Sequence, residues 1–102
     1  MNKRLSYLEQ LVEDGKADSF ARYALGMEYR KEGRNADALR TFEALRAADP
    51  DYLAAYLMVG QLASETNDPE TAREWLNAGK ALAEKQGDSK ALGEIDDLLA
   101  TL

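Results

Sequence analysis

The chain contains no cysteine and no histidine, and only two prolines, among its 102 residues. Without cysteine it can form no disulfide and offers no thiolate nucleophile. Without histidine it lacks the commonest general base of enzymes and the commonest metal ligand of proteins. We therefore expect no catalytic residue, no metal and no cofactor. A chain free of cysteine also fits the reducing cytoplasm, where we expect the protein to work.

Long hydrophobic runs are also missing. The longest nearly apolar stretch, YLAAYLMVG at 52–60, has about half of the ~20 residues that a membrane-spanning helix needs. The opening MNKRLSYLEQLVED is interrupted by Glu9 and Gln10, so it does not resemble a secretory signal. With 45% hydrophobic and 31% charged residues, the composition is typical of one ordered helical domain, and no membrane association is expected.

Charge is distributed unevenly along the chain. Residues 1–46 carry nine basic and eight acidic groups, a net of +1, whereas residues 47–102 carry four basic and eleven acidic groups, a net of −7. The total of −6 disfavours nucleic acid as a partner, because phosphates require a basic surface. An acidic surface that keeps the protein in solution explains the second half.

The carboxylates show no pattern of an enzyme site. Asp96 and Asp97 are adjacent, so on a helix they point about 100° apart and cannot share a proton or a metal ion. Glu28 and Glu32 share one helical face, but basic residues crowd the same turn, which is typical of a solvated charged surface. No glycine-rich phosphate loop is present. The sequence predicts a protein that is not an enzyme.

Gly26 lies inside the strongly helix-favouring stretch FARYALGMEYRKEG, although glycine costs a helix about 1 kcal/mol relative to alanine. Another glycine, Gly60, stands 34 residues later in the same kind of context. Three further pairs keep this offset: Leu25 with Val59, Ala38 with Ala72, and Phe42 with Leu76. A period of 34 residues predicts two copies of a unit made of two helices.

At these residues the sequence resembles the tetratricopeptide repeat, whose pattern is W-x2-L-G-x2-Y, then A-x3-F, then P. The first copy reads Arg22-x2-Leu25-Gly26-x2-Tyr29, then Ala38-x3-Phe42, then Pro50, with arginine at the tryptophan position. The second copy reads Tyr56-x2-Val59-Gly60-x2-Ala63, then Ala72-x3-Leu76, with Glu84 at the proline position. Without that proline, we expect the last helix of the second copy to continue to about Gly87.

The ends of the chain extend this pattern. LSYLEQL at 5–11 aligns with LRTFEAL at 39–45, which predicts the second helix of a repeat whose first helix is missing. At the other end, Leu92, Ile95, Leu99 and Leu102 share one helical face, as expected of a terminal capping helix with a polar outer side. We expect one domain: a half-repeat at 1–17, repeats at 18–50 and 51–87, and a cap at 88–102.

Residues that favour helix ends divide the chain further. Gly33 and Asn67 tolerate the left-handed backbone of helix C-termini, and Asp68 before Pro69 is a typical N-cap. The expected fold is all-α, a tetratricopeptide-like superhelix of antiparallel helices with no sheet. Six helices are predicted, at about 3–14, 19–32, 35–48, 52–66, 69–86 and 88–101.

The resemblance also implies why glycine stands inside these helices. The paired helices of one repeat cross closely, and a side chain at Gly26 or Gly60 would hold their backbones apart. We expect Ala38 to pack against Gly26, and Ala72 against Gly60.

In the resembling family, the first helices of the repeats line the concave side of a superhelix, where repeat positions 2, 5, 9, 12 and 13 face the ligand. Carried over, these positions are Phe20, Tyr23, Met27, Arg30 and Lys31 in the first repeat, and Ala54, Leu57, Gln61, Ser64 and Glu65 in the second. All of them except Ala54 and Glu65 form the predicted partner-binding set. Aromatic rings and methionine suit such a surface, because rings give a large contact area at little entropic cost and methionine adapts its shape.

An alternative stays open for this set. Phe20, Tyr23 and Met27 are spaced as a helix spaces its core residues, and Leu8 or Leu11 of the N-terminal helix could cover them. The sequence therefore predicts a non-catalytic module that binds a peptide or helix of a partner protein in its groove. The alternative function is self-association, in which the unequally charged halves meet head to tail or a symmetric homodimer buries the apolar groove.

Overall fold

The computed structural model describes residues 1–102, which form six α-helices and no strand. The all-α prediction is confirmed, and each helix begins and ends within one residue of its predicted bounds. The helices are α1 (Lys3–Glu13), α2 (Ser19–Lys31), α3 (Asn35–Ala48), α4 (Leu53–Glu65), α5 (Pro69–Gln86) and α6 (Ser89–Ala100).

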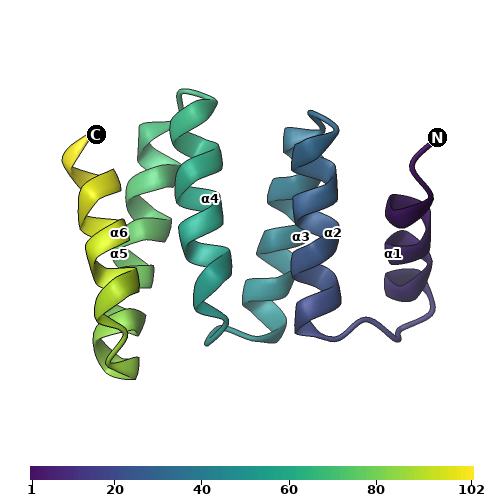
Figure 1. The fold of residues 1–102 in the computed structure, drawn as a ribbon, viewed down its shortest axis with the longest axis horizontal. Coiled ribbons are helices and arrows are strands. Elements are labelled where there is room, and N and C mark those ends of the chain that lie inside the picture. The colour runs from purple at the N-terminus through teal and green to yellow at the C-terminus, as the bar shows by residue number, and fades with distance from the viewer. The chain divides into compact units, whose positions relative to one another are not determined.

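These helices form two compact units. The first unit, Met1–Pro50, contains α1 to α3, and the second, Asp51–Leu102, contains α4 to α6. Within each unit, consecutive helices run in opposite directions (Figure 1). In the first unit α2 packs against both α1 and α3. In the second, α5 packs against α4 and α6, and α6 also contacts α4.

Aspartates begin several of the helices. The side chains of Asp18, Asp68 and Asp88 accept hydrogen bonds from backbone N–H groups in the first turns of α2, α5 and α6. These bonds satisfy donors that have no partner within the helix. Pro69 follows Asp68 at the first position of α5, where its missing N–H is harmless, so this predicted helix start is confirmed.

Residues with positive φ follow four helix ends, the first being that of α1, where Gly15 has a φ of 68°. Gly33 has a φ of 74° and Asn67 a φ of 60°, as predicted for the ends of α2 and α4. Gly87, with a φ of 70°, ends α5. The long last helix of the second repeat is thereby confirmed, because nothing stops it at Glu84.

Each helix-interior glycine of the two repeats lies under a large side chain. A Cβ atom on Gly26 would lie 2.5 Å from Cζ of Phe42, and one on Gly60 would collide with the side chain of Leu76. The close crossing of helices is therefore confirmed. The atoms nearest to these Cβ positions belong to Phe42 and Leu76, four positions after the predicted partners Ala38 and Ala72. The gap left by the missing side chain is filled by a ring or an isobutyl group.

Hydrogen bonds and an ion pair connect the N-terminal part of the chain with α2. Asn2 Nδ2 donates a hydrogen bond of 3.0 Å to Glu28 Oε2, and Arg4 forms an ion pair of 3.0 Å with the same carboxylate. The hydrogen bond from Asn2 is the main reason why the pKa of Glu28 is lowered. At the next residue of α2, the Tyr29 hydroxyl donates to Glu9 Oε2 of α1 at 2.6 Å. The half-repeat helix is thus held by specific bonds as well as by its leucines.

Helix α6 packs as the sequence predicts for a terminal helix. Ile95 is fully buried, and Leu92, Leu99 and Leu102 are partly buried against the same core cluster. The outer side of the helix is polar. On that side Asp96 forms an ion pair of 3.0 Å with Lys80 of α5.

Candidate partner-binding surfaces

One face of α2 carries the residues predicted from the first repeat. The Phe20 side chain, in the first turn, is 66% exposed. Tyr23 and Met27 follow on the same side and are half-buried. At the C-terminal end of the helix, Arg30 is half-buried and Lys31 is exposed. The face therefore runs from an exposed aromatic ring to two basic residues.

The leucines of α1 do not pack on this face. Leu8 and Leu11 belong to a cluster with Ala24 and Leu25, on another side of α2, and Phe20, Tyr23 and Met27 are not part of it. Tyr23 instead packs on Phe42 of α3, with ring centroids 5.9 Å apart and planes inclined by 56°. One side of the Tyr23 ring thus rests on the core, which restricts its motion.

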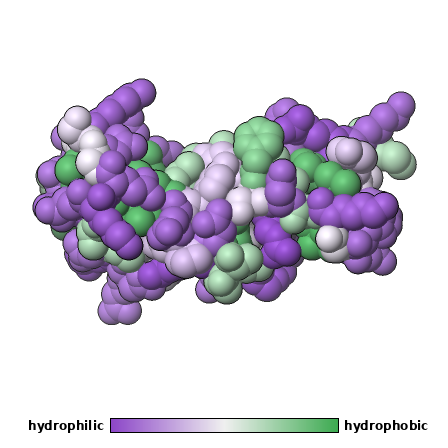
Figure 2. Space-filling model, turned by 90° about the horizontal axis from the view of Figure 1, so that it is seen from below, coloured by the Kyte–Doolittle hydropathy of each residue, from purple (hydrophilic) through white to green (hydrophobic).

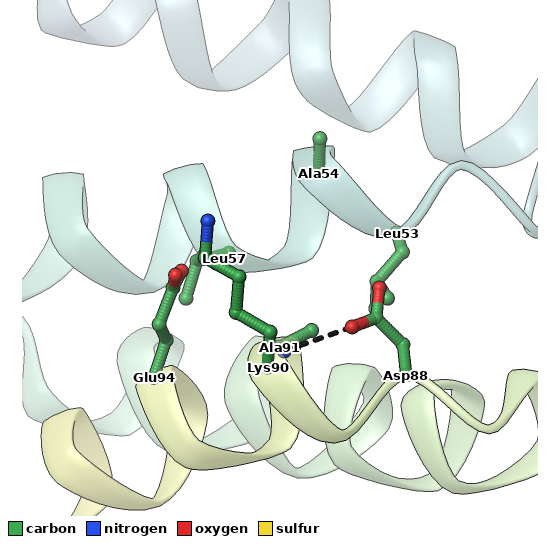
Figure 3. A pocket seen from close by; sticks show the side chains of 7 residues that line it. All are labelled: Leu53, Ala54, Leu57, Asp88, Lys90, Ala91 and Glu94. Carbon is green, nitrogen blue, oxygen red and sulfur yellow. Dashed lines mark hydrogen bonds between the residues drawn. The ribbon is translucent and has the colours of Figure 1, made fainter.

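In the second unit, a pocket of about 240 Å³ opens between the start of α4 and the start of α6. Its apolar lining comes from Leu53, Leu57 and Ala91, and three charged side chains lie around them (Figure 3). Ala54 also contributes to the lining. Leu57 is the predicted residue that the structure places at a hollow; the charged residues were not predicted. They are Asp88, Lys90 and Glu94.

Asp88 has two roles at this pocket. Its Oδ1 accepts a hydrogen bond of 3.0 Å from the backbone N–H of Ala91, drawn in Figure 3, and so caps α6. The same side chain lines the hollow. An N-cap signal in the sequence, aspartate before SKAL, could have located this end of α6, but not the pocket that depends on α4.

The other residues predicted from the second repeat lie farther along α4. Gln61 and Ser64 are half-buried, and neither lines the pocket. Ser64 Oγ is buried without a hydrogen-bond partner. Of the residues predicted from the second repeat, Leu57 therefore lies at the pocket, whereas Gln61 and Ser64 do not.

No three acidic side chains lie close enough together to hold a metal ion. None of the six helices combines the length and the apolar character that crossing a membrane requires. Hydrophilic residues cover most of the face seen in Figure 2, with hydrophobic residues in small areas between them. The face of α2 and the pocket between α4 and α6 are therefore the candidate binding sites.

Comparison with known proteins relates the chain to solved structures. It is 33% identical to a tetratricopeptide repeat domain protein from Salinibacter ruber in its solution structure, over 82% of this chain and 85% of that one, with a TM-score of 0.77. The crystal structure of a tetratricopeptide repeat domain protein from the same organism gives 34% identity over 81% and 93%, with a TM-score of 0.75. A protein from Bordetella parapertussis is 26% identical over 99% and 88%, with a TM-score of 0.84.

No curated protein matches the chain. The family model of the tetratricopeptide repeat matches residues 23–88, a range that includes most of both predicted repeats. The 34-residue period, the glycines under Phe42 and Leu76, and the antiparallel helix pairs agree with this match. The chain therefore belongs to the tetratricopeptide repeat family.

Proposed function

We propose that the protein is a non-catalytic interaction module that binds a peptide segment or a helix of a partner protein on the first helices of its repeats. Repeats of this family generally mediate interactions between proteins, and their fold is non-catalytic. The observation that supports the finer proposal best is the pocket between α4 and α6, with Leu57 in its lining.

The pocket has the form expected of an anchor site. Binding sites are concave and mostly apolar, with a few polar groups that fix the ligand. Here leucine and alanine side chains line the hollow, and Asp88, Lys90 and Glu94 stand around it. Fully burying one leucine or phenylalanine side chain contributes about 1.5–3 kcal/mol, so a single apolar anchor would give much of the affinity of a short peptide.

The face of α2 supports the same function in the first unit. Phe20 has an exposed ring, and the ring of Tyr23 packs on the ring of Phe42. A ring that is already held in place loses little conformational entropy on binding. Met27 adapts to the ligand, and Lys31 adds a positive charge at the end of the face. We propose that this face contacts the partner through apolar side chains, with acidic groups near Lys31.

A selection from a displayed library of random peptides tests the proposal. The variant Ala91→Leu places a larger side chain in the pocket, and Ala81→Leu makes the same change at an exposed position of α5 outside it. Peptides enriched on the wild type should bind Ala81→Leu equally and Ala91→Leu at least tenfold more weakly. Both variants are first compared with the wild type by circular dichroism.

Two results would count against this function. One is that no peptide is enriched on the folded wild-type protein. The other is that enriched peptides bind Ala91→Leu and Ala81→Leu with the same affinity, because the pocket would then not be the anchor site.

A further inference from the structure

The two repeats differ at one pair of corresponding positions. In the second unit Tyr56 of α4 and Trp75 of α5 pack together, with ring centroids 5.6 Å apart, and both are buried. The corresponding positions of the first repeat, 34 residues earlier in the chain, are Arg22 of α2 and Thr41 of α3. Two aromatic rings are thus replaced by a guanidinium and a small hydroxyl. Thr41 is much smaller than Trp75, so part of the volume of the aromatic pair has no counterpart in the first unit.

A pocket of about 200 Å³ lies at this position in the first unit. Arg22, Thr41 and Arg40 contribute polar side chains to its lining. Its apolar wall comes from all three helices of the unit, with Val12 from α1, Leu25 from α2 and Ala44 from α3. Val12 is one of the few large hydrophobic residues exposed on the surface, at 37%.

The charges in this pocket are not balanced. Asp37, the one acidic residue of the pocket, forms ion pairs with Arg34, whose Nε lies at 2.9 Å, and with the guanidinium of Arg40, but not with Arg22. These bonds, led by the one from Arg34, lower the pKa of Asp37. The Arg22 guanidinium, in contrast, forms no hydrogen bond or ion pair. One cation therefore lines the pocket without a counter-charge.

An unpaired guanidinium beside an apolar wall suits a carboxylate on a short aliphatic stem. Guanidinium and carboxylate form two parallel charge-assisted hydrogen bonds, which are stronger than neutral ones. The methylene groups of the stem would be removed from water against Val12, Leu25 and Ala44. We propose that this pocket binds the side-chain carboxylate of a glutamate in a partner polypeptide, with Arg22 as its principal ligand.

This site is separate from the face of α2 described above. Arg22 follows Phe20 by two residues, which is about 200° around the helix. Phe20, Tyr23 and Met27 do not line the pocket. Failure of either proposal therefore leaves the other untouched, because the proposed function is tested at Ala91 and Phe20, whereas this site is tested at Arg22.

The test is an NMR titration of the backbone amides with two blocked peptides, acetyl-Ala-Glu-Ala-amide and acetyl-Ala-Gln-Ala-amide. The only carboxylate of the first peptide is its glutamate side chain, and the second is a neutral match. The glutamate peptide should shift amides around Val12, Arg22 and Thr41 and bind at least tenfold more tightly than the glutamine peptide. Arg22→Gln should abolish this preference.

Two further variants make the test specific. Arg73→Gln removes an exposed arginine of α5 and should change nothing. The double variant Arg22→Tyr, Thr41→Trp recreates the aromatic pair of the second unit, fills the pocket and should lose binding of both peptides. If that variant does not fold, Arg22→Gln alone still decides the outcome.

Three results would overturn the proposal. Equal binding of the two peptides would show that charge is not recognised, and unchanged binding by Arg22→Gln would show that another cation is responsible. Butyrate, a free carboxylate of similar size, serves as a third probe. Tighter binding of butyrate than of the glutamate peptide would assign the pocket to a small molecule instead of a polypeptide.

Discussion

A Cβ atom on Gly26 would lie 2.5 Å from Cζ of Phe42, which is closer than such atoms approach in real structures. Phe42 is fully buried, so its ring can move aside only by displacing the side chains packed around it. Gly26→Ala should therefore destabilise the protein even though alanine favours helices. Overpacking costs about 1–3 kcal/mol, so urea unfolding followed by circular dichroism should show a net loss of up to about 2 kcal/mol after the helix gain of about 1 kcal/mol.

Gly93 provides the opposite case in the same protein. It lies inside α6, where a Cβ atom would meet nothing within 4 Å. Gly93→Ala should raise the free energy of unfolding by up to about 1 kcal/mol, because only helix propensity changes there. A stabilising Gly26→Ala, or a strongly destabilising Gly93→Ala, would show that the two glycines are not distinguished by the packing described here.

The Tyr29 hydroxyl makes stability sensitive to alkaline pH. Burial and the hydrogen bond to Glu9 raise its pKa to about 12, from 10 in the unfolded chain. Below pH 10 both states hold the proton, and the preference of the folded state for neutral tyrosine contributes fully to stability. Between pH 10 and 12 the unfolded state loses its proton first, so this contribution is lost as pH rises.

Tyr29→Phe isolates that effect. In a spectrophotometric titration at alkaline pH, the variant should lack the tyrosine that ionises near pH 12 in the wild type. The difference in unfolding free energy between wild type and variant should shrink from pH 10 upwards. A difference that stays constant to pH 12 would mean that Tyr29 ionises as an ordinary tyrosine does.

Asp18 anchors the start of α2, whose exposed face begins two residues later. Its Oδ1 accepts a hydrogen bond of 2.8 Å from the N–H of Ala21. Asp18→Ala should cost about 1 kcal/mol in urea unfolding, whereas Asp18→Asn keeps an acceptor and should cost only a few tenths. Equal losses for the two variants would indicate that the charge of Asp18, and not its capping bond, stabilises the helix.

Local signals in the sequence were sufficient for the helices. Asp68 before Pro69, and Gly33 and Asn67 after helix ends, act within a few residues of their own backbone, so their effects can be predicted from the chain alone. The 34-residue period then fixed which helices pair. The partner of Gly26 could not be found in this way, because choosing Phe42 over Ala38 depends on the crossing geometry of two helices.

The candidate sites were harder to predict for the same reason. Leu57 was expected from its repeat position, but its pocket exists only because Asp88, Lys90 and Glu94 of a later segment lie opposite. Arg22 was visible in the sequence as a departure from the tryptophan position. The sequence could not show that Arg22 lines a pocket, because Val12, Arg22 and Ala44 lie on three different helices and meet only in the folded unit.

The most direct test of the proposed function is affinity capture from a lysate of the source organism with matched double variants. Phe20→Ala with Ala91→Leu alters both candidate surfaces. The control, Tyr7→Ala with Ala81→Leu, removes one exposed aromatic ring and enlarges one alanine outside these surfaces; Tyr7 is 64% exposed, close to the 66% of Phe20. The wild type and the control should retain the same protein, and the altered variant should lose it. Equal retention by all three folded proteins, or retention of nothing by the wild type, would contradict the proposal.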